Sequence, residues 1–137
     1  MNKSISILSA LFITIGYVHS KDAAAEKIQA DEQAAEVAIQ GAWEMKNEDG
    51  TVRLKFISGG RWAITQCDAE TGTVIFHHGG TYKLDGDTYT ETVVYANDNT
   101  TDLIGKVHAF VIKIDGGALS QVGVGNPWTE EWTRIKE

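Results

Sequence analysis

The sequence predicts an all-β domain of about eight antiparallel strands, closed into an up-and-down barrel and preceded by a signal peptide and a short helical leader. Thirteen of the fourteen glycines lie between Gly41 and Gly125, where turn signals recur at short intervals. The runs between these signals are rich in β-branched and aromatic residues, which favour strands. Because the connections are short and carry no helical pattern, successive strands should pair antiparallel. Closure removes the exposed edges of such a sheet, so a barrel is favoured over an open or flattened sandwich.

The first twenty residues have the pattern of a signal peptide. Lys3 gives a basic start, residues 5–18 form an apolar run, and Val18-His19-Ser20 suits cleavage after Ser20. An uncleaved membrane anchor is the alternative, but this run is shorter than the roughly 20 residues that a spanning helix needs. We therefore expect a secreted or periplasmic protein with no stable membrane insertion after cleavage.

Residues 21–38 are expected to form a helical leader, because they are rich in Ala, Glu and Gln and contain no Gly or Pro. Residues 39–137 would then form the barrel domain. Removing residues 1–20 takes away Lys3 and no acidic residue, which changes the net charge from −7 to −8. An acidic chain argues against nucleic acid or an anionic membrane as partner. Cys67 is the only cysteine, so an internal disulfide is impossible.

The turn signals divide the domain into eight expected strands. Asp85-Gly86 lies between two alternating runs and predicts a hairpin turn. Gly79-Gly80 falls inside a long strand and predicts a bend or a bulge there. The expected strands cover residues 40–47, 51–58, 60–67, 73–84, 87–95, 105–115, 117–124 and 128–135.

Alternation within each strand indicates which side chains face inward. The larger apolar residues mark the inner face, as with Phe110 and Ile112 in the sixth strand. By the same criterion, Phe56 in the second strand is expected to face inward, and Arg53 and Lys55 are expected to face outward. The seventh strand gives no clear preference.

Several polar side chains are nevertheless expected inside the barrel. Glu91 shares a strand face with Tyr89 and Tyr95, which are among the larger side chains of that strand. Buried polar groups cost free energy unless they are paired. A self-paired network, a wet cavity and a ligand site therefore all remain open. The expected inward polar residues are Gln66, His78, Tyr82, Tyr89, Glu91, Tyr95, His108 and Arg134.

Gly41-Ala42-Trp43 resembles the G-x-W motif of lipocalins and their calycin relatives, and Arg134 is placed like the basic residue that packs across that tryptophan. The run from Gly79 to Tyr95 and the terminal EEWTRI, which contains Trp132, resemble the lipocalin-like domains of small secreted bacterial proteins without a settled activity. The resemblance covers residues 39–135. The Thr-Asp-Tyr motif of lipocalins proper is not evident, so the resemblance is to the wider group. It implies binding of a small apolar ligand, by analogy of fold alone.

The sequence carries no motif for a catalytic nucleophile, a cofactor or a metal. His77 and His78 are adjacent on a strand and point to opposite faces, so they cannot hold one ion together. His78, His108 and Glu91 lack the spacing of a metal motif. The expected function is the binding of a small apolar or amphiphilic molecule. A hydrolase or isomerase using Glu91 and His108 is one alternative, and a structural module with a filled barrel is another. Candidate ligand-binding residues are His78, Tyr82, Tyr89, Glu91, Tyr95, His108 and Arg134.

Overall fold

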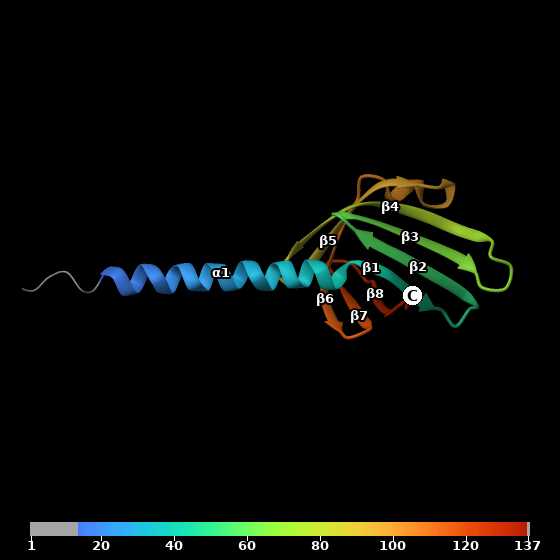
Figure 1. Ribbon diagram of the computed structural model, residues 1–137. Helices are drawn as coiled ribbons and strands as arrows, with labels where there is room; N and C mark the ends of the chain where they lie inside the picture. The colour runs from blue at the N-terminus through green and yellow to red at the C-terminus, as the bar shows by residue number, and fades with distance from the viewer. Residues whose placement is uncertain (1–13, 137) are drawn as a thin grey trace, which may run out of the picture.

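The computed structural model describes residues 14–136, and for residues 14–20 only the backbone. A helix, α1 (Thr14–Ile39), precedes eight strands that form one closed antiparallel barrel in the order β1 to β8 (Figure 1). A short 3-10 segment, η1 (Asp98–Leu103), connects β5 to β6. The predicted all-β, closed up-and-down barrel with a helix before it is confirmed, and each strand lies within two residues of its expected bounds. The strands are β1 (Gly41–Lys46), β2 (Thr51–Ser58), β3 (Arg61–Asp68), β4 (Val74–Asp85), β5 (Thr88–Ala96), β6 (Val107–Asp115), β7 (Ala118–Val124) and β8 (Thr129–Arg134).

Helix α1 is longer than the expected leader and runs without a break past the predicted cleavage point after Ser20. Residues 1–13 of the predicted signal peptide lie outside the described residues. The first part of α1 extends away from the barrel, and only its last turns lie against it (Figure 1). In the described part of the chain, no helix combines the length and the apolar character needed to span a membrane.

The end of the barrel next to α1 is closed by a tryptophan and an arginine. Trp43 is fully buried, and its indole Nε1 donates to the carbonyl of Ile39 at 2.9 Å. Arg134 pairs with Trp43 across the β1–β8 ladder and lies 4.1 Å above its ring. The guanidinium also donates to the carbonyls of Gln40 and Ala38, at 2.7 and 2.5 Å. The expected packing of Arg134 on Trp43 is therefore present, and it ties the end of α1 to the barrel.

A two-residue turn fixes the register of β2 and β3. Gly59 and Gly60 both have positive φ, 57° and 76°, as a tight hairpin turn requires. Ile57 therefore pairs with Trp62, and Lys55 pairs with Ile64. Directly paired residues lie on the same face of an antiparallel sheet, so the inward Trp62 and Ile64 bring their partners inward too.

This register corrects the expected orientation of β2. Lys55 and Ile57 are each 1% exposed, whereas Phe56 is 50% exposed. The expectation that Phe56 faces inward and Lys55 outward was wrong. The physical reason is that the hairpin register outweighs the preference for burying the larger apolar side chains.

A β-bulge interrupts the pairing of β4 and β5, as the Gly79-Gly80 pair indicated. Gly79 pairs with Tyr95 and Gly80 pairs with Val93, so Val94 is an extra residue in β5. A Cβ atom at Gly80 would collide with the backbone oxygen of Thr92, so only glycine fits this close approach.

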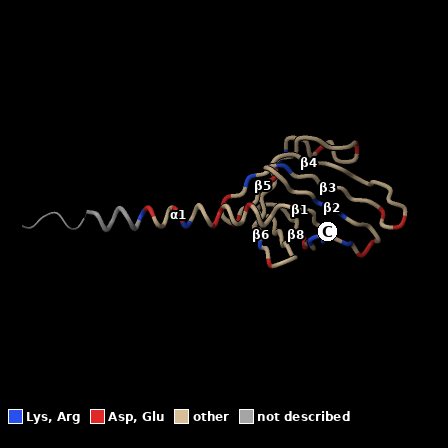
Figure 2. Tube along the Cα trace, viewed as in Figure 1, with Lys and Arg blue, Asp and Glu red and all other residues tan. Residues whose placement is uncertain are grey.

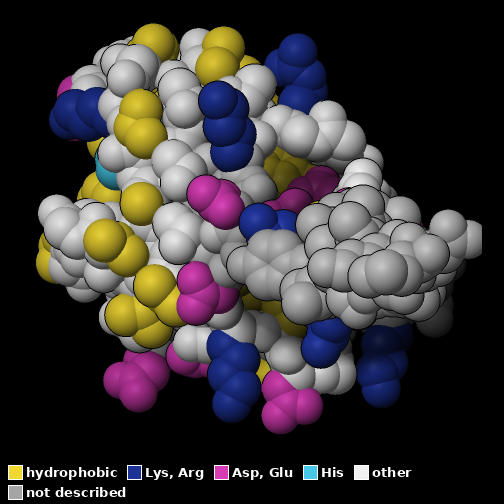
Figure 3. Space-filling view, turned by 90° about the vertical axis from the view of Figure 1, so that its left-hand side faces the viewer, with side chains coloured by type: hydrophobic (Ala, Val, Ile, Leu, Met, Phe, Trp, Pro, Cys, Tyr) yellow, Lys and Arg dark blue, Asp and Glu magenta, His cyan; other side chains and the backbone are white. Residues whose placement is uncertain are grey.

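Charged residues are spread over the molecule. Along the trace, Lys and Arg positions are interleaved with Asp and Glu in α1, in the strands and in the turns (Figure 2). From the side on which α1 projects, the surface shows side chains of both signs between small hydrophobic areas (Figure 3).

Candidate functional site

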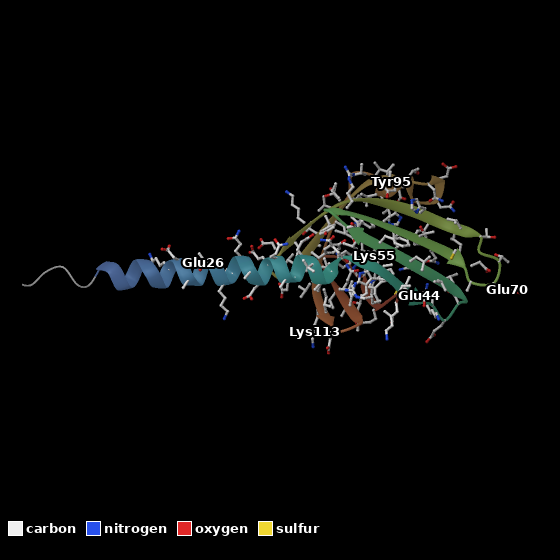
Figure 4. All side chains as sticks on the ribbon, in the orientation of Figure 1. Glu26, Glu44, Lys55, Glu70, Tyr95 and Lys113 are labelled. Carbon is white, nitrogen blue, oxygen red and sulfur yellow. The ribbon has the colours of Figure 1, made fainter. Side chains whose placement is uncertain are left out.

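A buried lysine lies at the centre of the barrel. Lys55 is labelled within the barrel in Figure 4, and its side chain is 1% exposed. Its Nζ lies 2.7 Å from Oε1 of Glu91 and donates to Oε1 of Gln121, also at 2.7 Å. Burial of an ammonium costs several kcal/mol unless such close partners compensate it. Lys55 therefore holds together β2, β5 and β7 through polar contacts across the core.

Aromatic rings surround the same ammonium. Its Nζ lies between 5.1 and 5.8 Å from the centres of four rings, a range in which a cation is attracted to a π-face. The rings come from four different strands, so they form a cage rather than a single stacking pair. These residues are Trp62, Tyr89, Phe110 and Trp132.

A second cation and a second carboxylate extend this network. Glu130 Oε2 lies 3.8 Å from Nζ of Lys55, and its Oε1 lies 3.4 Å from Nη1 of Arg53. Arg53 also donates from Nε to Oε1 of Gln66 at 2.6 Å. The carboxylate of Glu130 thus bridges the two cations. With Glu91 included, two positive and two negative groups are paired within one network.

The pKa of Glu91 is raised above its ordinary value, chiefly because burial disfavours the carboxylate. The charge and hydrogen bond of Lys55 oppose this rise. With Lys55 as an ammonium and Glu91 as a carboxylate, the pair is neutral as a whole. Burial also raises the pKa of Tyr89 well above its ordinary value, and the charge of Glu91 adds to that rise.

A cavity of about 210 Å³ lies above this network, at the end of the barrel away from α1. Its walls combine aromatic and aliphatic side chains with the charged groups of the network and two histidines. Its outer lining includes two residues of η1 and a tryptophan that is 41% exposed. The lining residues are Arg53, Lys55, Trp62, Ile64, Phe76, His78, Glu91, Thr100, Leu103, His108, Phe110, Trp128 and Glu130.

The two histidines of the cavity are held by aromatic rings. The imidazole of His78 stacks on Phe76 at 5.2 Å and meets the ring of Trp62 edge-on at 5.6 Å. His108 meets Trp128 edge-on at 4.6 Å. Burial, followed by the charges of His77 and Lys55, lowers the pKa of His78 to about 4. Burial also lowers the pKa of His108. Both imidazoles are therefore neutral at pH 7.

The structure brings three of the predicted ligand-binding residues together in the cavity lining: Glu91, His78 and His108. Tyr82 and Tyr89 are buried with their rings 5.1 Å apart but do not line the cavity. The hydroxyl of Tyr82 donates to Glu36 of α1, at the closed end. Burial first, and then this contact, raise the pKa of Tyr82 to about 12.

Two predicted site residues lie elsewhere. Tyr95 is 42% exposed and contacts the ring of His77 at 5.7 Å on the outer face (Figure 4). Its predicted inward orientation was wrong, because the extra residue of the bulge shifts the alternation between Val93 and Tyr95. Arg134 faces Trp43 and the last carbonyls of α1, so its guanidinium makes its ring contact and its hydrogen bonds at the closed end.

The buried basic residues and two of their partners were not predicted from the sequence. Lys55 and Arg53 were expected outside, Gln121 lies on the strand whose faces were ambiguous, and Glu130 was not singled out. The two-residue Gly59-Gly60 turn was the available signal for Lys55, since it fixes which residues of β2 share a face with Trp62. The bond between Lys55 and Gln121 joins residues 66 positions apart, and no local pattern indicates it.

Other hollows and side-chain clusters are less suited to a ligand. Grooves of about 280 and 370 Å³ run along α1, and no charged side chain that lines them is buried. Within residues 14–136, no group of three or more His, Cys, Asp or Glu side chains could hold a metal ion. Glu91 and His108 are register partners on β5 and β6, but the close partner of Glu91 is Lys55.

No family model, curated protein or solved structure matches this chain.

Proposed function

We propose that the protein is an exported, lipocalin-like binding module that holds a small apolar or amphiphilic molecule in its barrel. The cavity at the end away from α1 carries this proposal. It combines about 210 Å³ of space with apolar walls and a few fixed polar groups, which is the usual composition of a small-molecule site. Eight-stranded barrels have room inside for one small ligand or for filling side chains.

The arrangement of the two ends supports this assignment. The α1 end is filled by Trp43 and by the end of α1, whereas the cavity lies next to the η1 connection and Trp128. A ligand would therefore enter past η1. The polar floor formed by Lys55 and Glu91 limits how deep it can go.

Native mass spectrometry of the protein purified from its own host tests the proposal. We expect a small molecule to be retained by the wild-type protein and lost from Thr100→Trp, which places an indole at the cavity lining. Thr133→Trp adds the same side chain at an exposed position near the closed end and should retain the molecule. A barrel that retains nothing, and whose tryptophan emission responds to no small probe, would be a filled structural module.

A further inference from the structure

The charged groups that line the cavity are already paired with one another. Lys55 contacts Glu91 at 2.7 Å, and Glu130 lies 3.8 Å from Lys55 and 3.4 Å from Arg53. The four groups sum to zero, so the lining offers no unpaired charge to an incoming ion. A charged ligand would lose its hydration shell here without gaining a counter-charge, which is costly in a site of low dielectric constant.

The histidines of the lining carry polar atoms that no described residue hydrogen-bonds. Nδ1 of His78 is buried and has no hydrogen-bond partner among the described residues. Nε2 of the same ring also has no hydrogen bond to a described residue, but it is not fully buried. The ring lines the cavity, so Nε2 is the atom that remains accessible to a ligand. Stacking on Phe76 and the edge contact with Trp62 fix the plane of the ring.

The size and walls of the cavity favour a planar ligand. Rings from Trp62, Phe76, Phe110 and Trp128 line it, and flat ligands stack well on such walls. An engineered apolar cavity of about 150 Å³ is known to hold benzene. A cavity of about 210 Å³ therefore suits one ring with substituents, or two small fused rings.

We propose that the cavity selects an uncharged molecule built on one or two rings, which hydrogen-bonds to Nε2 of His78. This inference rests on the proposed binding function and narrows its ligand class. His78 is then the residue that determines specificity, while the Lys55–Glu91 pair supplies a neutral polar floor.

Four probes that share one ring test this selectivity: toluene, benzyl alcohol, benzoate and benzylammonium. Their dissociation constants are measured at pH 7.5 by calorimetry and by the change in tryptophan emission, to which Trp62 and Trp128 of the lining contribute. We expect benzyl alcohol to bind at least about tenfold more tightly than either ion. In His78→Phe the affinity for benzyl alcohol should fall about two- to tenfold, while the affinity for toluene changes little.

His77→Phe is the matched control. His77 is the adjacent residue on β4, but its Nδ1 hydrogen-bonds Oγ1 of Thr65 at 2.7 Å and its ring contacts Tyr95 outside the barrel. This variant should leave all four affinities unchanged, and thermal melts confirm that both variants are folded.

Each contrary outcome has one meaning. Tighter binding of benzoate or benzylammonium would overturn the neutral-ligand inference and leave the binding function standing. Equal losses for toluene and benzyl alcohol in His78→Phe would overturn the hydrogen bond to His78. Failure of all four probes to bind, toluene included, would overturn the inference of a ring-based ligand; the proposed function itself would be contradicted only if native mass spectrometry also found no retained molecule.

Discussion

The two ends of the barrel use aromatic and basic side chains in different ways. At the α1 end, Arg134 covers a fully buried Trp43 and gives its hydrogen bonds to the carbonyls of Ala38 and Gln40. At the other end, the exposed Trp128 meets His108 beside a cavity. The first arrangement fills the α1 end of the barrel, and the second leaves a cavity at the other end. Lys55 and Glu91 form the boundary between them.

This difference indicates which residues are suited to stability and which to binding. A buried ring with a fully bonded cation contributes to folding whatever the ligand is. Imidazoles without protein hydrogen bonds in a cavity contribute little to folding, as is common for functional groups. Substitutions at the two ends should therefore separate the free energy of unfolding from ligand affinity.

The largest effect is expected from Trp43→Ala at the closed end. Loss of the buried indole should lower the free energy of unfolding by about 3–5 kcal/mol. Loss of the cation over its ring should add about 0.5–2 kcal/mol. Denaturant titration measures the sum, and probe affinity of the folded fraction should persist. A loss no larger than that of Arg53→Ala would contradict the role given to Trp43.

Lys55→Met tests the boundary between the two ends. It leaves the carboxylate of Glu91 buried without its closest cation, which should cost about 3–5 kcal/mol. The double variant Lys55→Met/Glu91→Leu should regain most of this loss, because an apolar pair replaces the ionic one. Lys83→Met, at an exposed lysine, should stay within about 0.5 kcal/mol of wild type. Equal values for the two lysine variants would show that the buried pair does not stabilise the fold.

The pH dependence of stability should sharpen the contrast further. The pKa of His78 is about 4 in the folded protein and near its ordinary value of 6.5 when unfolded. Between these pH values the folded state binds fewer protons than the unfolded state, so protonation favours unfolding. The titration of His78 therefore leaves the free energy of unfolding unchanged above pH 6.5 and lowers it as the pH falls toward 4. Melting temperatures from pH 7 to 4 should fall more steeply for wild type than for His78→Phe. Parallel curves would mean that His78 does not titrate in this window.

Among the variants of the cavity network and of the closed end, Arg53→Ala should have the smallest effect, although Arg53 belongs to the same network as Lys55. Its side chain is 30% exposed and its distance to Glu130 is 3.4 Å, so solvent screens the pair. We expect a loss of about 0.5–1 kcal/mol in a denaturant titration. A loss as large as that of Lys55→Met would show that burial is not what distinguishes the two cations.

The strands could be predicted from the sequence because turn residues and alternating side chains are local signals. The inner faces of β3 and β6 followed correctly from Trp62, Ile64 and Phe110. The predicted orientation of β2 was wrong because its inner face was chosen from the sizes of the side chains in that strand alone. Combining the Gly59-Gly60 turn with the inward Trp62 would have placed Lys55 inside.

The outward turn of Tyr95 could not be predicted in the same way. The glycine pair indicated an irregularity, but not that the extra residue would be Val94 on the partner strand. Likewise, the contact of Lys55 with Gln121 depends on barrel closure, which places β2 and β7 side chains in one interior. Such contacts follow from the assembled barrel and not from any segment of it.

The pairing that closes the barrel also has consequences for the kinetics of folding. Strands β1 and β8 share only the register pairs Trp43↔Arg134 and Glu44↔Thr133, whereas every other ladder joins successive strands. Arg134 reaches a carbonyl 94 residues away, so this contact carries a high loop-closure entropy and should form late. Interactions absent from the folding transition state slow unfolding more than they speed folding. The Arg134 contacts should therefore affect the unfolding rate, and with it the lifetime of the closed barrel, more than the folding rate.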